Sequence, residues 1–118
     1  MTKPKDSKVW IVIPAYNEEA TIGRVIDSLK AEGWKNILVV NDGSTDRTAR
    51  IARERGACVV SHPKNVGLGG ALRTGLSEVY HRGADVAVTF DADGQHHPKD
   101  VKKLVRVLSS GNYDLVIG

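Results

Sequence analysis

Residues 86–98 read VAVTFDADGQHHP, an apolar run that ends in two carboxylates one residue apart. The run 86–90 is apolar and rich in β-branched residues, which predicts a strand buried on both faces of a parallel sheet. Asp91 and Asp93 follow at the carboxyl end of that strand, where open α/β sheets place their ligands. Two carboxylates so close repel each other unless a cation lies between them, and a hard divalent ion with a phosphate-bearing ligand fits. The alternative is a plain turn, in which Asp and Gly are favoured and Pro98 starts a helix.

The composition is that of an ordinary globular domain. The 118 residues, 41% hydrophobic and 26% charged, suffice for one domain over residues 1–118. The net charge of +3 suits an anionic small ligand, while 5% aromatic content and the lack of a dense Lys/Arg run argue against a nucleic-acid partner. The single Cys58 excludes an internal disulfide, and no apolar run reaches the length of a membrane span. We therefore expect a cytoplasmic location.

Apolar runs alternate with segments of helical periodicity along the whole chain. The runs predict strands at 9–13, 37–40, 57–60, 86–90 and 115–117. The helices are expected from 18 to 33, from 46 to 55, from the glycine-rich loop to 83, and from 98 to 108. This alternation predicts an α/β fold with a mostly parallel sheet and right-handed crossovers.

Three of the predicted strands end in polar segments, at 14–18, 41–46 and 91–95. In a parallel sheet the carboxyl ends of these strands lie along one edge. We therefore expect the three segments to line one crevice, and we place the functional site there.

The segments after the first two strands offer candidate nucleoside ligands. The Asp42 carboxylate can accept a hydrogen bond from a nucleobase N–H or a ribose hydroxyl, and Gly43 lets a ligand ring lie close to the backbone. The alternative for Asp42 is an Asn-Asp-Gly-Ser turn in which Ser44 or Thr45 caps the next helix. Tyr16 either stacks on a base or packs over its own loop.

The glycine-rich run 65–75 reads NVGLGGALRTG and does not match a standard phosphate loop. A dinucleotide fingerprint needs Gly where Leu72 stands, and a Walker loop needs Lys where Leu76 stands. What remains is a glycine-rich entry to a helix, whose N-terminus can face an anion. Arg73 either reaches that ligand or is a solvated helix cation.

The segment 90–94 also resembles the start of haloacid-dehalogenase phosphatases, in which the first Asp is a nucleophile. That pattern needs Thr or Val where Gln95 stands and normally follows the first strand of the fold. We therefore rank a phosphatase below a nucleotide-binding function.

Four motifs, at 12–18, 40–46, 65–69 and 90–95, together resemble the inverting family 2 glycosyltransferases. Within that family the chain is most similar to the dolichyl-phosphate mannose or glucose synthases. The resemblance implies a GT-A fold, a Rossmann-like three-layer α/β domain that binds a nucleotide-diphospho-sugar such as a GDP- or UDP-hexose.

The resemblance also implies roles for individual residues. The nucleotide-binding positions would be Pro14, Ala15, Tyr16, Glu18 and Asp42, with Arg73 added from the reading of the glycine-rich helix. The DxD region, which holds the metal and the sugar-phosphate, matches Asp91, Asp93 and Gln95. The metal would be Mg²⁺ or Mn²⁺, which neutralises the charge that grows on the leaving nucleoside diphosphate.

The sequence departs from the family pattern in two ways. It ends at Gly118, inside the fifth predicted strand, whereas family members continue with an antiparallel strand, an acceptor-binding region and the general base. We therefore expect a truncated, donor-binding N-terminal part, with the catalytic base beyond Gly118 and no sugar transfer by this chain alone. The second departure is Asn41, which stands where Asp is more usual.

These readings predict the donor half of an enzyme that transfers a hexose to a polyprenyl or dolichyl phosphate, at the cytoplasmic face of the membrane. The alternative is a non-catalytic module that binds nucleotide without transferring sugar.

The family's later antiparallel strand is missing from this sequence. Either 115–117 pairs with 86–90, or the strand 86–90 has an apolar open edge, which favours pairing between chains. We therefore expect a homo-oligomer.

Overall fold

The computed structural model describes residues 8–93 with their side chains, together with the backbone of residues 104–109 and 112–117. The elements follow in the order β1 (Val9–Ala15), α1 (Ile22–Ala31), β2 (Ile37–Asp42), α2 (Thr48–Glu54), β3 (Cys58–His62), α3 (Leu68–His81), β4 (Val86–Thr89), β5 (Leu104–Ser109) and β6 (Asn112–Ile117). The strands form one sheet in the order β3-β2-β1-β4-β5-β6. The first four strands in that order are parallel, while β5 and β6 are antiparallel to their neighbours.

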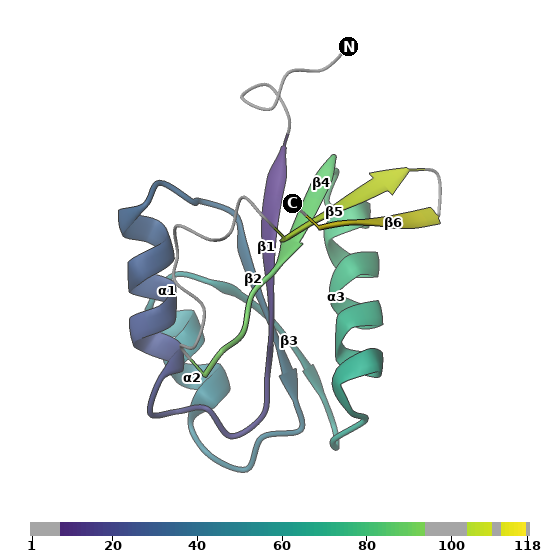
Figure 1. The fold of residues 1–118 in the computed structure, drawn as a ribbon. Coiled ribbons are helices and arrows are strands. Elements are labelled where there is room, and N and C mark those ends of the chain that lie inside the picture. The colour runs from purple at the N-terminus through teal and green to yellow at the C-terminus, as the bar shows by residue number, and fades with distance from the viewer. Residues whose placement is uncertain (1–7, 94–103, 110–111, 118) are drawn as a thin grey trace.

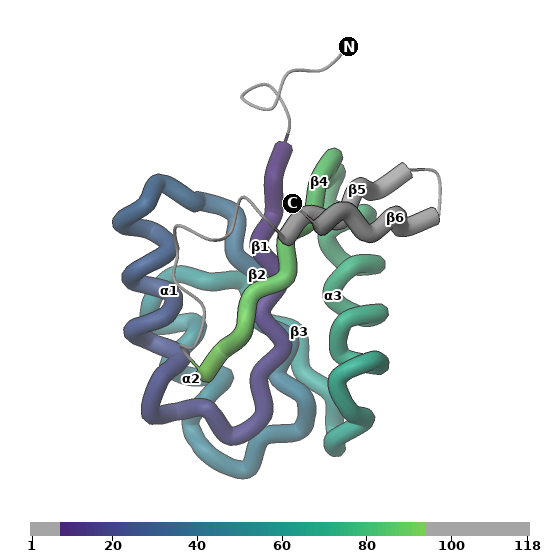
Figure 2. Tube along the Cα trace, viewed as in Figure 1, coloured from purple at the N-terminus to yellow at the C-terminus, as the bar shows by residue number. Residues whose placement is uncertain are grey.

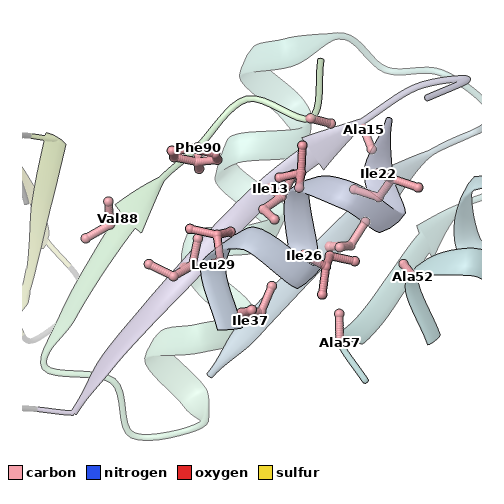
Figure 3. Packing of buried hydrophobic residues seen from close by; sticks show 14 residues of the cluster. Ile13, Ala15, Ile22, Ile26, Leu29, Ile37, Ala52, Ala57, Val88 and Phe90 are labelled. Carbon is pink, nitrogen blue, oxygen red and sulfur yellow. The ribbon is translucent and has the colours of Figure 1, made fainter. Parts of the chain in front are cut away.

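Helices cover both faces of the parallel part of the sheet. Figure 1 shows α1 and α2 on one side and α3 on the other. Because side chains alternate along a strand, Ile11 and Ile13 of β1 face the α1 side, whereas Trp10 and Val12 face α3. The α1 side of this core is drawn in Figure 3, where Ile26 and Leu29 lie over the sheet. The prediction of a three-layer α/β fold is confirmed.

The strand order reverses at β1, since β2 and β3 lie on one side of it and β4 on the other. Such a switch point is where open α/β sheets bind their ligands, at the carboxyl ends of the strands. In Figure 2 the chain continues beyond β4 towards the beginning of α1. The polar segments that follow β1, β2 and β4 therefore emerge at the same edge of the sheet.

The prediction of a helix from 98 to 108 is wrong where the structure describes the chain. Residues Leu104–Ser109 form β5, which pairs antiparallel with β4, Val88 opposite Val105. The spacing of Leu104, Val105 and Leu108 fits a helix, but the two β-branched residues of LVRVLS also suit a strand, and pairing with an available edge overrides local propensity. Pro98 itself lies outside the described residues.

The expectation that β4 has an open edge, or pairs with 115–117, is also wrong. Residues 115–117 belong to β6, which pairs with β5, so that β5 covers the β4 edge. The homo-oligomer remains a prediction, but that argument no longer supports it.

Smaller differences concern the ends of elements. The acidic residues Glu18 and Glu19 precede α1 instead of forming its first turn, and α2 begins at Thr48 instead of 46. The N-cap of α2 is Arg47, which makes no capping hydrogen bond with its side chain, and the Thr48 amide donates to Oδ1 of Asp46, one residue before the cap, at 2.9 Å. In the described part of the chain, no helix is long and apolar enough to cross a membrane.

Candidate functional site

A cavity of about 150 Å³ lies at the carboxyl ends of β1 and β2 and reaches the start of α3. Its lining residues are Pro14, Ala15, Tyr16, Asp42, Asn65, Gly67, Leu68 and Ala71. The cavity thus brings together residues from three of the four motifs found in the sequence. Of the residues predicted to bind nucleotide, Glu18 and Arg73 are not part of its lining.

A larger groove of about 500 Å³ lies between α1 and α2, and its lining includes Arg24, Asp27 and Arg55. Arg55 and Asp27 form an ion pair across it. Among the described residues, none of those predicted to be functional lines this groove. We therefore place the site at the smaller cavity, where the motifs converge.

The rim of the smaller cavity is apolar. Among the described residues, the large hydrophobic side chains that remain exposed are Tyr16 (48%), Val66 (54%) and Leu68 (63%). Tyr16 and Leu68 line the cavity, and Val66 directly precedes Gly67 in its wall. Exposed apolar surface around a small cavity suits a planar ring such as a nucleobase.

Asp42 is 4% exposed, and its carboxylate binds the loop that forms one wall of the cavity. Its Oδ1 accepts from the Val66 amide at 3.0 Å and lies 2.8 Å from His62 Nδ1, and its Oδ2 accepts from the Gly67 amide at 3.0 Å. Burial by itself raises the pKa of Asp42, but these hydrogen bonds outweigh it, so the pKa is lowered from its usual value. Asp42 is therefore an ionised anchor for the 65–67 loop. The turn considered as the alternative is also present, since the Ser44 amide donates to Asn41 Oδ1 at 3.2 Å, but the N-cap of α2 is Arg47 and not Ser44 or Thr45.

The expectation that Gly43 makes room for a ligand ring is wrong. Gly43 has φ +77°, and a Cβ placed on it would collide with the backbone of Lys64 and Asn65. The space beside Gly43 is thus filled by the chain's own loop. Asn65 also donates from Nδ2 to the Asp42 carbonyl oxygen at 3.2 Å, which fastens the loop at a second point.

Side chains join the loops that follow β1 and β2. Asn17, in a left-handed conformation with φ 51°, accepts at Oδ1 from the Thr45 amide at 2.8 Å. The Asn17 amide donates to Ser44 Oγ at 2.9 Å, and the Glu19 amide donates to Asp46 Oδ2 at 3.2 Å. Burial raises the pKa of Asp46, but hydrogen bonds from Thr48 and Glu19 outweigh it and lower the pKa. The two loops are thus fixed to each other without any ligand.

The Asp91 and Asp93 carboxylates lie on the solvent side of the segment after β4. Both residues are exposed, whereas Ala92 between them is 3% exposed and packs in the core. The Ala92 carbonyl oxygen accepts from Thr21 Oγ1 at 2.7 Å. Because the middle residue is held inward, both carboxylates are presented outward.

The pKa of Glu18 is raised from its usual value. Burial is the main cause that raises its pKa, and neighbouring carboxylates raise it further. Those carboxylates belong to Asp93, Asp46 and Asp91.

The donor set fits a hard divalent cation that shares its coordination with a ligand. No three His, Cys, Asp or Glu side chains able to hold a metal by themselves come together in the described residues. Mg²⁺ is commonly held by one or two carboxylates together with substrate phosphates, which is what Asp91 and Asp93 offer. Gln95, the third residue predicted for this role, lies outside the described residues.

Arg73 is exposed on α3, beyond the turn that lines the cavity. Its contact with a ligand phosphate stays a prediction.

Sequence reasoning missed His62, Thr74 and Thr21. His62 contacts both Asp42 and Thr74, and Thr21 holds Ala92. The sequence carries no local signal for His62, because its place opposite Asp42 follows from the register of β3 against β2.

The fold and this edge define the class: a three-layer α/β domain that carries a ligand cavity and paired carboxylates at the carboxyl ends of its strands. Among solved structures, the chain is similar to glucosyl-3-phosphoglycerate synthase of Mycobacterium tuberculosis in complex with Mn²⁺, UDP and glucosyl-3-phosphoglycerate. The TM-score is 0.68 at 34% identity, covering 85% of this chain and 39% of that one. The structural neighbours have the GT-A fold, so the predicted fold class is confirmed.

The chain belongs to glycosyl transferase family 2, whose family model matches residues 10–118. It is 50% identical over 111 residues to an uncharacterized protein of Methanocaldococcus jannaschii, covering 94% of this chain and 46% of that protein. It is 38% identical over 130 residues to UDP-N-acetylglucosamine–dolichyl-phosphate N-acetylglucosaminyltransferase of Methanococcus voltae, covering 96% of this chain and 52% of that enzyme. The chain thus spans about half the length of these relatives. The predicted family is confirmed, and the phosphatase alternative loses its basis.

Proposed function

We propose that this chain binds a nucleotide-diphospho-sugar together with Mg²⁺ or Mn²⁺, as the donor-binding part of a glycosyltransferase. The observation that carries the proposal is the convergence of the β1, β2 and β3–α3 motifs on one cavity with an apolar rim. The mildly basic net charge of +3 is compatible with an anionic ligand.

In this proposal the nucleoside occupies the cavity. Its base stacks between Tyr16 and Leu68, whose exposed surfaces it covers. A carboxylate offers about four acceptor positions. His62, Val66 and Gly67 use three of those at Asp42, which leaves one for a base N–H. Uracil and guanine both carry such an N–H.

The sugar-phosphate end is assigned to Asp91 and Asp93. These two residues would hold the metal, which supplies charge neutralisation for the leaving nucleoside diphosphate. The Thr21–Ala92 bond fixes the segment that presents both carboxylates. Glu18 lies within electrostatic reach of these carboxylates: burial is the main cause that raises its pKa, and the charges of Asp93, Asp46 and Asp91 raise it further.

Thermal unfolding tests the donor assignment. UDP, GDP, dTDP and their hexose conjugates are each added with Mn²⁺ or with EDTA. A ligand that binds only the native state adds about 2.7 kcal/mol at one hundred times its Kd. We expect a UDP compound to give the largest stabilisation, and we expect it only with Mn²⁺. If no nucleotide raises the melting temperature, the proposed function is wrong.

The matched variants are Asp91→Asn and Asp93→Asn. Each should abolish the difference between Mn²⁺ and EDTA, because an amide cannot replace a carboxylate as an anionic ligand. Asp27→Asn is the control, since Asp27 lies in the groove between α1 and α2. An unchanged Mn²⁺ effect in both site variants would remove the metal role.

The acceptor is proposed from the relatives. The Methanococcus voltae enzyme is named for dolichyl phosphate and the Mycobacterium tuberculosis enzyme for 3-phosphoglycerate, and both acceptors carry phosphate. We propose a polyprenyl or dolichyl phosphate at the cytoplasmic face of the membrane. A transfer assay with dolichyl phosphate in vesicles, beside one with 3-phosphoglycerate, separates the two acceptors. We expect no transfer by this chain alone, so donor binding without transfer to either acceptor would agree with that expectation, and transfer by the chain alone would contradict it.

A further inference from the structure

His62 lies at the end of β3 and makes a hydrogen bond with each of its two ring nitrogens. Nδ1 is 2.8 Å from Asp42 Oδ1, and Nε2 is 2.8 Å from Thr74 Oγ1 on α3. The His62 side chain is 17% exposed, so water has little access to either bond. The ring therefore connects the end of β2 to α3 directly beneath the wall of the cavity.

The partners of Asp42 define the direction of these bonds. Asp42 also receives the Val66 and Gly67 amides, which can only donate, one on each carboxylate oxygen. Both oxygens therefore act as acceptors, and His62 Nδ1 must carry the proton that is donated to Oδ1. In the neutral ring Nε2 is then an acceptor, so the Thr74 hydroxyl donates to it.

The order hydroxyl, imidazole, carboxylate is also that of a hydrolase triad. Thr74 is only partly buried on α3, but it does not line the cavity that the motif residues form. A substrate in that cavity would meet Tyr16, Leu68 and the Asp42 side of the network instead. The arrangement therefore suits holding Asp42 in place better than attacking a substrate.

Resting on the proposed nucleoside in this cavity, we propose that His62 is a positioning residue for it. His62 orients the Asp42 carboxylate so that one oxygen holds Val66, the other holds Gly67, and the remaining acceptor position faces the ligand. Thr74 positions the ring in turn. Loss of the His62–Asp42 bond lets the carboxylate rotate, which misplaces both the acceptor and the loop that forms the wall.

Two amide substitutions separate the two bonds. In His62→Asn the side-chain nitrogen lies near the position of Nδ1 and can still donate to Asp42. In His62→Gln the amide reaches towards the Nε2 position and serves Thr74 instead. Thr74→Val removes the hydroxyl while keeping the shape. His81→Gln is the control, because His81 is exposed and bonds only to the Ser77 carbonyl of its own helix among the hydrogen bonds described.

The measurement is UDP binding with Mn²⁺ by calorimetry. We expect His62→Gln to raise Kd about tenfold or more, as loss of a hydrogen bond to a charged group does. His62→Asn should stay within about threefold of the unmodified chain, Thr74→Val should lie between, and His81→Gln should change nothing. Equal affinity of His62→Gln and the unmodified chain would overturn the proposal. So would equal losses in His62→Asn and His62→Gln, which indicate a general packing role.

Nuclear magnetic resonance supplies a readout that does not depend on a variant folding. The ¹⁵N shifts of the unmodified His62 ring should show a proton on Nδ1, and a ring protonated at Nε2 but not at Nδ1 would overturn the proposal. Failure of the unmodified chain to bind UDP, GDP or dTDP would instead contradict the proposed function. A normal Kd in His62→Gln, with UDP bound by the unmodified chain, contradicts the positioning role alone.

Discussion

The Thr21 hydroxyl, just before α1, donates a 2.7 Å hydrogen bond to the carbonyl oxygen of Ala92. The two residues are 71 positions apart in the sequence. Their bond joins the start of the first helix to the segment that carries Asp91 and Asp93. The segment that presents both carboxylates is thus bonded to a hydroxyl that belongs to neither the β4 strand nor its motif, and we expect the outward direction of the carboxylates to depend on it.

Replacing Thr21 with Val tests this dependence. The variant keeps the shape but leaves the Ala92 carbonyl without that donor, so we expect a loss of about 1 kcal/mol in stability. We also expect the Mn²⁺-dependent stabilisation by UDP to fall, because the carboxylates lose their support. Thermal unfolding with Mn²⁺ or EDTA measures both effects. Thr21→Ser retains the hydroxyl and should behave like the unmodified chain; if it does not, the hydroxyl is not the cause.

Asp42 should contribute to the acid side of the stability curve. Its pKa is lowered in the folded state, whereas an unfolded Asp titrates near about 3.9. The stabilisation is therefore fully present above about pH 4 and is lost as the pH falls through the folded pKa. Asp46, also with a lowered pKa, acts in the same direction, and Glu18, with a raised pKa, acts in the opposite one.

Urea unfolding of Asp42→Asn at several pH values checks this. At neutral pH the variant should be less stable, because an amide nitrogen then faces the Val66 or Gly67 amide. Its stability should fall less steeply than that of the unmodified chain as the solution is acidified. Parallel curves for the two proteins would contradict the assignment.

Gly75 fixes the distance between α3 and the sheet. A Cβ at Gly75 would collide with Val12 Cγ1 and lie 3.0 Å from Val40 Cγ2. Gly75→Ala should therefore destabilise the fold by about 1–3 kcal/mol through overpacking. A Cβ at Gly69, on the same helix, would meet no neighbouring atom within 4 Å, so Gly69→Ala should be neutral or slightly stabilising. Denaturant midpoints of both variants measure the contrast, and similar midpoints would show that α3 can shift.

Tyr16 is predicted to contribute to affinity and little to folding. It is 48% exposed and lines the cavity, so Tyr16→Ala should leave the melting temperature nearly unchanged. Loss of a stacking partner for a base should weaken UDP binding by about 1–3 kcal/mol. Tyr16→Phe keeps the ring and should bind normally. A large drop in melting temperature with Tyr16→Ala would instead favour the alternative that Tyr16 packs over its loop.

The parallel part of the fold could be predicted because its signals are local. The apolar run of β1 and the recurrence of Ile22, Val25, Ile26 and Leu29 in α1 specify strand and helix directly, and both are buried as expected. The segment of β5 could not be predicted in this way. Its residues satisfy both helical and extended patterns, and the choice depends on pairing with the edge of β4, which is not a local property.

Site residues that directly follow predicted strands could be predicted from the sequence. Site residues that come together only through tertiary contacts could not. Pro14, Ala15, Tyr16 and Asp42 come together because each lies at a strand end. The partners of Asp42 come from β3 and the loop that follows it, and only the register and the crossover bring them near. The space beside Gly43 was misread for the same reason, since only the tertiary fold shows that residues 64–65 fill it.

Hydrogen bonds between the loops after β1 and β2 should affect how tightly a ligand binds. They join Asn17 to Ser44 and Thr45, and Glu19 to Asp46. Both loops become ordered when the chain folds, so a ligand that arrives meets walls whose conformational entropy has already been lost. Substitutions at these polar positions will then shift the melting temperature and the dissociation constant in step. Under the proposed function, changes in donor affinity and changes in thermal tolerance would therefore arise from the same few hydroxyl, amide and carboxylate groups.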